Sequence, residues 1–268
     1  MKIVLIISLM LASFSSLALS CNNFKQQITF EDDIKGIILI VHGLNLNPEK
    51  MESLGNFYKA KKIAPIYVRL TGHTENTSWD QVTKQRWIKD FYSPLCQAHV
   101  NSKQLNIPMY GLGFSLGALV IQHAIEKFNA PFESVSYIAP AFKTRWYTMF
   151  ITALFKMGLT FEIPSGNFVE YRAKDSTGLL AYKGMWEITQ ELKFNDNIKK
   201  VITMDKRDEL IDYFSTRDLC KTWSNCQMEE LISSPSKNEK KIYHLAIDSA
   251  TLGQKAWNKL TLILSQQL

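Results

Sequence analysis

The residues best suited to do chemistry lie in the sequence Gly113-Phe114-Ser115-Leu116-Gly117. A serine hydroxyl is a weak nucleophile unless it is exposed, held in place and deprotonated by a neighbouring base. In a G-x-S-x-G sequence, a sharp turn between a strand and a helix holds the serine out from the backbone. An apolar run precedes Ser115 and a helical pattern follows it. We therefore predict a nucleophile here rather than a glycine-rich connection without chemistry.

A nucleophilic serine also needs hydrogen-bond donors for the negative charge that develops on its substrate. Residues 36–41 form an uninterrupted, largely β-branched apolar run, which predicts a strand buried on both faces. The backbone can bend sharply at Gly43, so the N–H of Leu44 can turn toward the serine. We expect the N–H groups of Leu44 and Leu116 to form this oxyanion hole, and the His42 side chain to be structural.

The base should be a histidine that follows the nucleophile in the sequence. Of the five histidines, only His244 gives the chain order serine, acid, histidine. Imidazole titrates near neutral pH, so it can take the serine proton and return it to the leaving group. We expect Asp208 to orient this histidine, with Asp205 and Glu209 as alternatives in the same charged loop. Such a loop can also be simply solvated.

Apolar runs and helical patterns predict the elements that would position these groups. A chain of 268 residues, 46% of them apolar, suits one α/β domain over residues 21–268. We expect a mostly parallel sheet flanked by helices, because strand patterns alternate with helical ones. A helical stripe should run from Trp79 to Phe91, and a last helix from residue 251 to 268. The predicted strands are residues 36–41, 62–70, 107–114, 133–139, 199–204 and 241–245.

The segment from about residue 143 to 190 has a different pattern. Between Trp146 and Phe161 it is apolar nearly all round, which is unusual for a surface helix. It could be a helix packed in the core or a cap over the active site. An insertion between two parallel strands would lie over their carboxyl ends, so we favour a helical cap. A methionine-rich lining there would suit flexible acyl chains.

The N-terminus and the cysteines indicate an exported protein. Residues 1–20 combine one lysine, an apolar run and small residues, which is typical of a secretory signal peptide. A buried helix or a retained anchor is the alternative. Cys21 also half-resembles the acylated cysteine of a bacterial lipoprotein, which would anchor the protein. In an exported chain Cys220 could pair with Cys226 and Cys21 with Cys96; acylation of Cys21 would leave Cys96 free.

Charge and ligand spacing argue against other classes of function. The net charge of +6 is spread along the chain without a long basic block, so there is no nucleic-acid signature. This charge would nevertheless tolerate an anionic membrane surface. His73 has no companion ligand at metal spacing. We expect neither a metal nor a cofactor.

Together these residues resemble the α/β-hydrolase superfamily, in particular its monoacylglycerol lipase, carboxylesterase and serine aminopeptidase group. The resemblance implies an α/β-hydrolase fold with a helical cap, and a triad of Ser115, Asp208 and His244. Thr71 and Thr74 depart from the family pattern, which has proline and glycine at these places. The motifs that carry the resemblance, from about residue 36 onward, are residues 38–44, 70–73, 111–118, 138–141, 205–208 and 244.

The expected function is therefore that of a secreted serine hydrolase. It would cleave carboxylic esters through an acyl-enzyme, and an apolar cap favours a lipid-like ester such as a monoacylglycerol or lysophospholipid. Two alternatives stay open. One is a peptidase or amidase that uses the same triad, and the other is a secreted binding protein that kept the fold and lost turnover.

Overall fold

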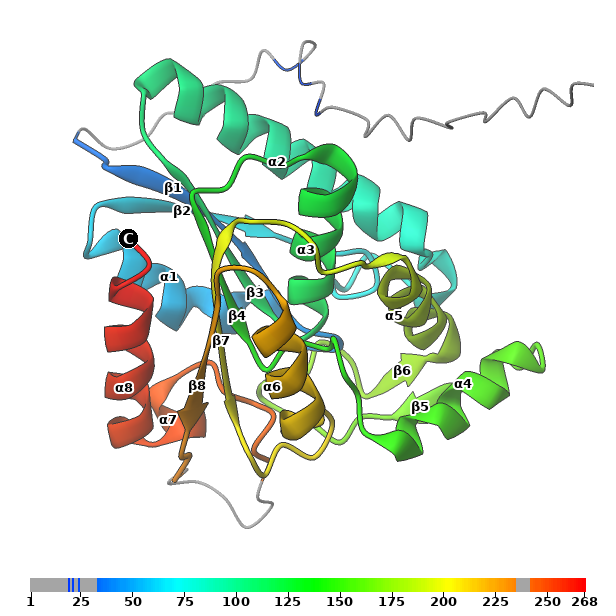
Figure 1. The fold of residues 1–268 in the computed structure, drawn as a ribbon. Coiled ribbons are helices and arrows are strands. Elements are labelled where there is room, and N and C mark those ends of the chain that lie inside the picture. Colours follow the sequence, from blue (N-terminus) through cyan, green and yellow to red (C-terminus); the bar gives the residue numbers. More distant parts are fainter. Residues whose placement is uncertain (1–18, 20, 22–23, 25–32, 235–241) are drawn as a thin grey trace, which may run out of the picture.

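The computed structural model describes residues 33–234 and 242–268, together with Leu19, Cys21 and Phe24. Apart from Leu19, the predicted signal peptide lies outside the described residues. Six strands form one parallel sheet in the order β2-β1-β3-β4-β7-β8 (Figure 1). The predicted mostly parallel sheet is therefore confirmed. The strands are β1 (Gly36–Val41), β2 (Ile63–Val68), β3 (Met109–Phe114), β4 (Ser134–Ile138), β7 (Lys199–Asp205) and β8 (Cys226–Leu231).

The centre of the sheet forms the core, as its apolar sequences predicted. Every residue of β1, β3 and β4 is buried, because helices cover both faces. Helices α1 and α8 cover one face, and α2, α3 and α6 cover the other (Figure 1). These helices are α1 (Glu52–Lys59), α2 (Lys84–Leu105), α3 (Leu116–Phe128), α6 (Tyr213–Thr222) and α8 (Gln254–Ser265), and a short 3-10 helix, η1 (Pro48–Met51), precedes α1.

The strand register brings distant loops to one edge of the sheet. Val41 pairs with Gly113, and Ile138 pairs with both Phe114 and Thr203. The carboxyl ends of β1, β3, β4 and β7 are therefore neighbours, because all four strands run in the same direction. The loops that follow β1, β3 and β7 meet at this edge, where ligands bind in open α/β sheets.

A further layer of structure follows β4, within the range predicted for the cap. A 3-10 helix, η3 (Trp146–Thr148), leads into α4 (Met149–Lys156). Strands β5 (Glu162–Pro164) and β6 (Ser176–Gly178) then pair antiparallel. Helix α4 packs on α5 (Leu179–Glu191), and α5 packs on α2 and α3. Figure 1 shows α4 and β5 at the outside of the molecule.

The predicted last strand, residues 241–245, is wrong within the described residues 242–245, which form a loop. Among the described residues the last strand is β8, and its polar, half-exposed sequence has no apolar run to indicate it. In the loop, Glu209 Oε2 accepts the N–H groups of Tyr243 at 2.9 Å and His244 at 3.1 Å. A side chain thus takes the place of a strand partner, and His244 lies on a loop.

Two predicted helices also have different bounds. The stripe that starts at Trp79 is first a 3-10 helix, η2 (Trp79–Gln81). Helix α2 begins only after Thr83, whose side chain accepts the N–H of Arg86 at 3.0 Å and caps the helix. The predicted final helix is divided at Gly253, where φ is +78°. A short helix, α7 (Ser249–Leu252), precedes this glycine and α8 follows it.

All four cysteines are paired. Cys21 is joined to Cys96 of α2, and Cys220 is joined to Cys226. These are the two pairings expected from the sequence for an exported chain. The Cys21 side chain is therefore part of a disulfide and is not a free thiol that could be acylated.

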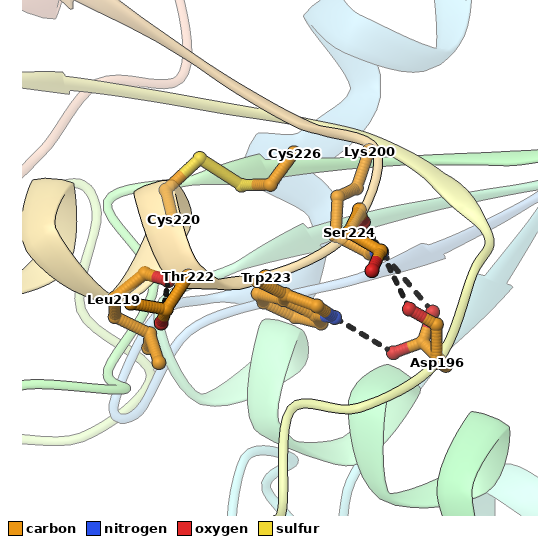
Figure 2. The surroundings of a disulfide bond; sticks show 8 residues. All are labelled: Asp196, Lys200, Leu219, Cys220, Thr222, Trp223, Ser224 and Cys226. Atoms are coloured by element: carbon orange, nitrogen blue, oxygen red, sulfur yellow. Dashed lines mark hydrogen bonds and ion pairs between the residues drawn. A yellow bond between two sulfur atoms is a disulfide. The ribbon is translucent and has the colours of Figure 1, made fainter.

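The second disulfide closes the loop between α6 and β8 beside a buried lysine (Figure 2). The ammonium of Lys200 lies 3.1 Å from the Asp196 carboxylate and 4.5 Å from the centre of the Trp223 ring. It also donates to the carbonyl of Ser224 at 2.8 Å. These partners satisfy a charge that would otherwise be costly to bury, and they hold the β7–β8 edge of the sheet together.

Candidate active site

Ser115 occupies a strained turn between β3 and α3. Its φ is +49° and its ψ is −109°, a conformation that costs a residue other than glycine about 1–3 kcal/mol. Neighbouring backbone holds the turn in place. The Ser115 N–H donates to the carbonyl of Ile138 at 3.0 Å, and the Ser115 carbonyl accepts the N–H of Ala141 at 3.2 Å.

The glycines on both sides of this turn are required by close packing. A Cβ at Gly117 would lie 2.1 Å from the carbonyl oxygen of Val41. A Cβ at Gly113 would lie 2.5 Å from the backbone nitrogen of Ala118. Both contacts are with main chain, which cannot move aside as a flexible side chain can. The spacing of the G-x-S-x-G sequence thus follows from how closely α3 approaches the sheet.

Three residues that are far apart in the sequence meet at the carboxyl edge of the sheet. The Nε2 atom of His244 lies 3.0 Å from Ser115 Oγ, and its Nδ1 lies 2.8 Å from Asp208 Oδ2. All three side chains are buried. Asp208 Oδ1 accepts the N–H groups of Leu210 and Ile211, both at 2.8 Å. The loop therefore holds one carboxylate oxygen while the other receives the N–H of the imidazole.

The two alternative acids have other partners. Asp205 accepts the Ser233 N–H at 2.8 Å and forms an ion pair with Arg207 at 2.7 Å. Burial alone would raise the pKa of Asp205, but these hydrogen bonds and the guanidinium lower it below its usual value. Glu209 binds the backbone of the His244 loop. The structure thus pairs His244 with Asp208 and gives Asp205 a role in the turn.

The electrostatics around His244 favour its charged form. Burial lowers the pKa of His244, but the charge and hydrogen bond of Asp208, with a further contribution from Glu209, outweigh this. The pKa of His244 therefore lies above its ordinary value. The pKa of Glu209 is itself raised, mainly by burial. An imidazole that is stabilised when charged can hold a proton taken from Ser115.

The two predicted oxyanion donors flank the serine. Leu44 lies on the wall of the same cavity as Ser115. Leu116 is the first residue of α3, so its N–H has no partner within the helix. No hydrogen bond among the described residues uses either N–H. Both groups are thus available as donors, although Leu116 is fully buried and does not line the cavity.

A cavity of about 670 Å³ opens from Ser115 beneath α4 and α5. Tyr147, Ile151 and Phe155 line it from the segment predicted to form the cap. The expected methionine-rich lining is wrong for Met149 and Met157, which are 62% and 67% exposed. Other lining residues include Phe114, Phe142, Met185, Trp186, Thr148 and Thr189.

The charge on the cavity wall is sparse. Its lining residues include one carboxylate, that of Glu209, and one histidine, His244. None of them is a lysine or arginine. This wall contrasts with the net charge of +6 for the whole chain. In the parts of the chain that the structure describes, no group of three or more His, Cys, Asp or Glu residues is placed to hold a metal ion.

Asn45, which was not among the predicted site residues, also lines the cavity. Its φ is +49°. Its side chain donates to the carbonyl of Lys174 and accepts the N–H of the same residue, both at 2.9 Å. These bonds join the loop after β1 to the segment before β6. An asparagine two positions after Gly43, in the loop that follows a predicted strand, was the available signal, because asparagine tolerates positive φ.

Comparisons with known proteins identify the fold. No family model and no curated protein matches the chain. A solved structure described with LipS and LipT, two metagenome-derived lipolytic enzymes, is 18% identical; the match covers 87% of this chain and 94% of that one, with a TM-score of 0.65. A soluble variant of monoglyceride lipase from Saccharomyces cerevisiae is 12% identical over 88% of this chain and 87% of its own, with a TM-score of 0.70. The monoacylglycerol lipase of Paleococcus ferrophilus is 13% identical over 89% and 97%, with a TM-score of 0.64. At these identities the likeness shows a shared α/β-hydrolase fold.

Proposed function

We propose that this chain, which has the α/β-hydrolase fold, is a serine hydrolase that cleaves carboxylic esters. The observation that carries the proposal is the hydrogen-bonded series from Asp208 through His244 to Ser115. Fold alone does not imply function. The series supplies what ester cleavage needs, namely a nucleophile in contact with a base that an acid orients.

In the proposed reaction, Ser115 Oγ attacks the ester carbonyl while His244 Nε2 takes its proton. The N–H groups of Leu44 and Leu116 stabilise the oxyanion of the tetrahedral intermediate. His244 then returns the proton to the leaving alcohol, and an acyl-enzyme remains. A water molecule, deprotonated by His244, releases the acid and restores Ser115. Asp208 keeps the proton of the neutral imidazole on Nδ1 throughout.

The cavity favours an uncharged, lipid-like ester as substrate. Its aromatic and aliphatic walls suit an acyl chain, and its threonine and asparagine side chains can bind hydroxyl groups. A lysophospholipid would bring a phosphate toward Glu209 without a lysine or arginine on the wall to receive it. A monoacylglycerol-type ester therefore fits the proposal better than a lysophospholipid.

A fluorophosphonate probe tests the proposal on the wild-type protein. We expect covalent labelling, with the adduct located by mass spectrometry on the peptide that contains Ser115. Initial rates on neutral esters of graded acyl length, and on matched amides, would then separate an esterase from an amidase. Folded wild-type protein that takes up no label and turns over no ester would instead be a binding protein of the same fold.

The acid side of the pH–rate profile should respond to Glu209. The value of kcat/KM should fall as the pH drops through the pKa of His244, because protonated imidazole cannot accept the serine proton. The Glu209 charge raises that pKa, so Glu209→Gln should move this fall to lower pH. The exposed Glu133→Gln serves as the control. A shift to higher pH in Glu209→Gln would contradict the assignment.

We also propose that the outer surface of the cap contacts membranes. Trp146, Met149 and Phe150 are 73%, 62% and 62% exposed, and the exposed Lys143 and Lys156 flank them. Aromatic side chains beside lysines suit an anionic membrane surface. Among the described residues, no helix is long and apolar enough to cross a bilayer.

Exchanging two of these side chains should weaken membrane binding. Each large apolar side chain contributes about 1.5–3 kcal/mol when fully buried, and partial burial is expected here. The double variant Trp146→Ser, Phe150→Ser should therefore bind anionic vesicles at least about tenfold more weakly in a sedimentation assay. Phe214→Ser, at an exposed site on α6, is the control. Equal binding by both variants would refute the contact.

We infer that the protein is exported rather than anchored through Cys21. The support is the pairing of all four cysteines, which is typical of oxidising compartments. Alkylation of denatured, unreduced protein should therefore modify no cysteine. Modification of Cys96 together with an acyl group on Cys21 would restore the lipoprotein interpretation.

A further inference from the structure

Two buried histidines outside the triad connect the loops beside the proposed oxyanion hole. His42 follows β1, and His73 lies in the loop after β2. The two side chains are buried, and their ring centres are 4.4 Å apart. Neither ring is among the residues that line the cavity. Their contacts with backbone groups nevertheless lead directly to Leu44.

His42 is bonded to the peptide group that carries the Leu44 N–H. The N–H of Leu70 donates to His42 Nε2 at 3.1 Å, so this nitrogen is the acceptor of a neutral ring. The ring proton is therefore on Nδ1, which donates to the Gly43 carbonyl at 2.9 Å. That carbonyl and the N–H of Leu44 belong to one peptide group. The peptide is planar and trans, so a bond that fixes the C=O also fixes the direction of the N–H.

His73 holds the next peptide group in the same way. The N–H of Asn45 donates to His73 Nε2 at 3.0 Å. The ring proton on Nδ1 then faces the carbonyl of Leu70 at 3.1 Å. The two peptide groups on either side of the Leu44 Cα are thus each bonded to an imidazole. Both imidazoles meet at Leu70, which donates to one ring and accepts from the other.

Both rings stay neutral near pH 7. Burial lowers the pKa of His42 to about 4, although its bond to Gly43 acts in the opposite direction. Burial, together with the neighbouring His42, holds the pKa of His73 well below its ordinary value. Each ring therefore keeps one donor and one acceptor nitrogen, as the hydrogen bonds require.

We propose that His42 and His73 are positioning residues for the oxyanion hole. His42 donates to the Gly43 carbonyl and so orients and polarises the Leu44 N–H, because hydrogen bonds in series strengthen one another. His73 fixes the following peptide group, so the backbone at Leu44 cannot rotate and turn its N–H away from the oxyanion. This inference rests on the proposed function, since an oxyanion hole has a role only if Ser115 is a nucleophile.

Asparagine and glutamine distinguish this role from a purely structural link between two loops. The amide nitrogen of asparagine is as many bonds from Cα as imidazole Nδ1, and the terminal amide of glutamine reaches as far as Nε2. His42→Asn can therefore still donate to the Gly43 carbonyl, whereas His42→Gln can still accept from Leu70. At His73 the group that holds Asn45 is Nε2, so there glutamine keeps the relevant bond and asparagine loses it.

The experiment compares the four variants in turnover of a neutral ester and in inhibition by a trifluoromethyl ketone. The serine oxygen adds to the carbonyl carbon of such a ketone, and the carbonyl oxygen becomes an oxyanion that lies in the oxyanion hole. Removal of an oxyanion-hole donor lowers kcat by about 10²–10³-fold. Loss of a hydrogen bond that only orients the donor should lower kcat by a smaller factor. We expect His42→Gln and His73→Asn to lose about 10–100-fold in kcat with little change in KM, and the inhibitor to weaken by a similar factor. His42→Asn and His73→Gln should each be at least several-fold more active than the other variant at the same position.

Thermal unfolding and two control variants separate positioning from stability. His99, half-buried on α2, provides His99→Asn and His99→Gln, which should not differ in kcat. Equal kcat within each pair, or the opposite order, in variants that unfold at similar temperatures would overturn the inference and leave the proposed function intact. Absence of both labelling and turnover in wild-type protein would overturn both.

Discussion

Ser115→Ala is expected to lower kcat for ester hydrolysis by about 10³-fold or more. The substitution removes Oγ, which is the attacking atom and lies 3.0 Å from His244 Nε2. It leaves the backbone bonds of the turn to Ile138 and Ala141 in place. Alanine and serine both carry a Cβ, so the cost of the positive φ is the same for each. The variant should therefore fold normally while losing turnover.

The measurement is steady-state kinetics on a neutral ester, with circular dichroism and thermal unfolding to establish folding. Ser93→Ala, at an exposed position of α2, is the matched control and should retain wild-type kcat. Residual activity of Ser115→Ala within about tenfold of wild type, in protein free of contaminating esterase, would remove Ser115 from the mechanism. Such a result would direct attention to a water nucleophile activated by His244.

Asp208→Asn is expected to lower kcat by about 10³–10⁴-fold. The carboxylate receives the Nδ1–H of His244 and stabilises the imidazolium that forms when Ser115 loses its proton. A neutral amide cannot provide the charge, and its NH₂ group can turn toward Nδ1 and favour the wrong tautomer. The size and shape of the side chain are nearly kept. The loop hydrogen bonds from Leu210 and Ile211 can still reach the amide oxygen.

Asp205→Asn is the matched comparison, because Asp205 is also buried and ends β7, directly before the loop that carries Asp208. Its carboxylate is bonded to Arg207 and Ser233 and not to His244. We expect this variant to unfold at a lower temperature while its folded fraction keeps kcat within a few-fold of wild type. If Asp205→Asn loses turnover in folded protein and Asp208→Asn retains it, the assignment of the acid is wrong.

Much of the fold could be predicted because its signals are local. The apolar runs of β1, β3, β4 and β7 indicated buried parallel strands, and the glycine spacing around Ser115 indicated the tight turn. Strand β8 was not predicted, since a polar edge strand has no such run. The predicted strand at residues 241–245 was wrong because Glu209, which is remote in the sequence, satisfies the backbone of that loop.

The candidate site also has parts that local sequence signals predicted and parts that depend on contacts between distant residues. The choice of Ser115 and of a histidine near the C-terminus followed from a motif and from chain order. Asp208 was the expected acid, but Asp205 and Glu209 stayed as alternatives, because all three lie within five residues and have the same functional group. The cap was expected from its unusual apolar pattern, but not which of its side chains would line the cavity.

The amino-acid sequence by itself determined the nucleophile turn, the buried strands and the cysteines available for pairing. These features depend on steric and hydrophobic preferences that act within a few neighbouring residues. Only the tertiary structure decided that Asp208 reaches His244, 36 positions away, and that His244 reaches Ser115 across 129 positions. It also decided that His73 binds the backbone of Asn45, 28 positions away. Hydrogen bonds act over about 3 Å, so such pairs form only when the sheet has brought its strand ends together.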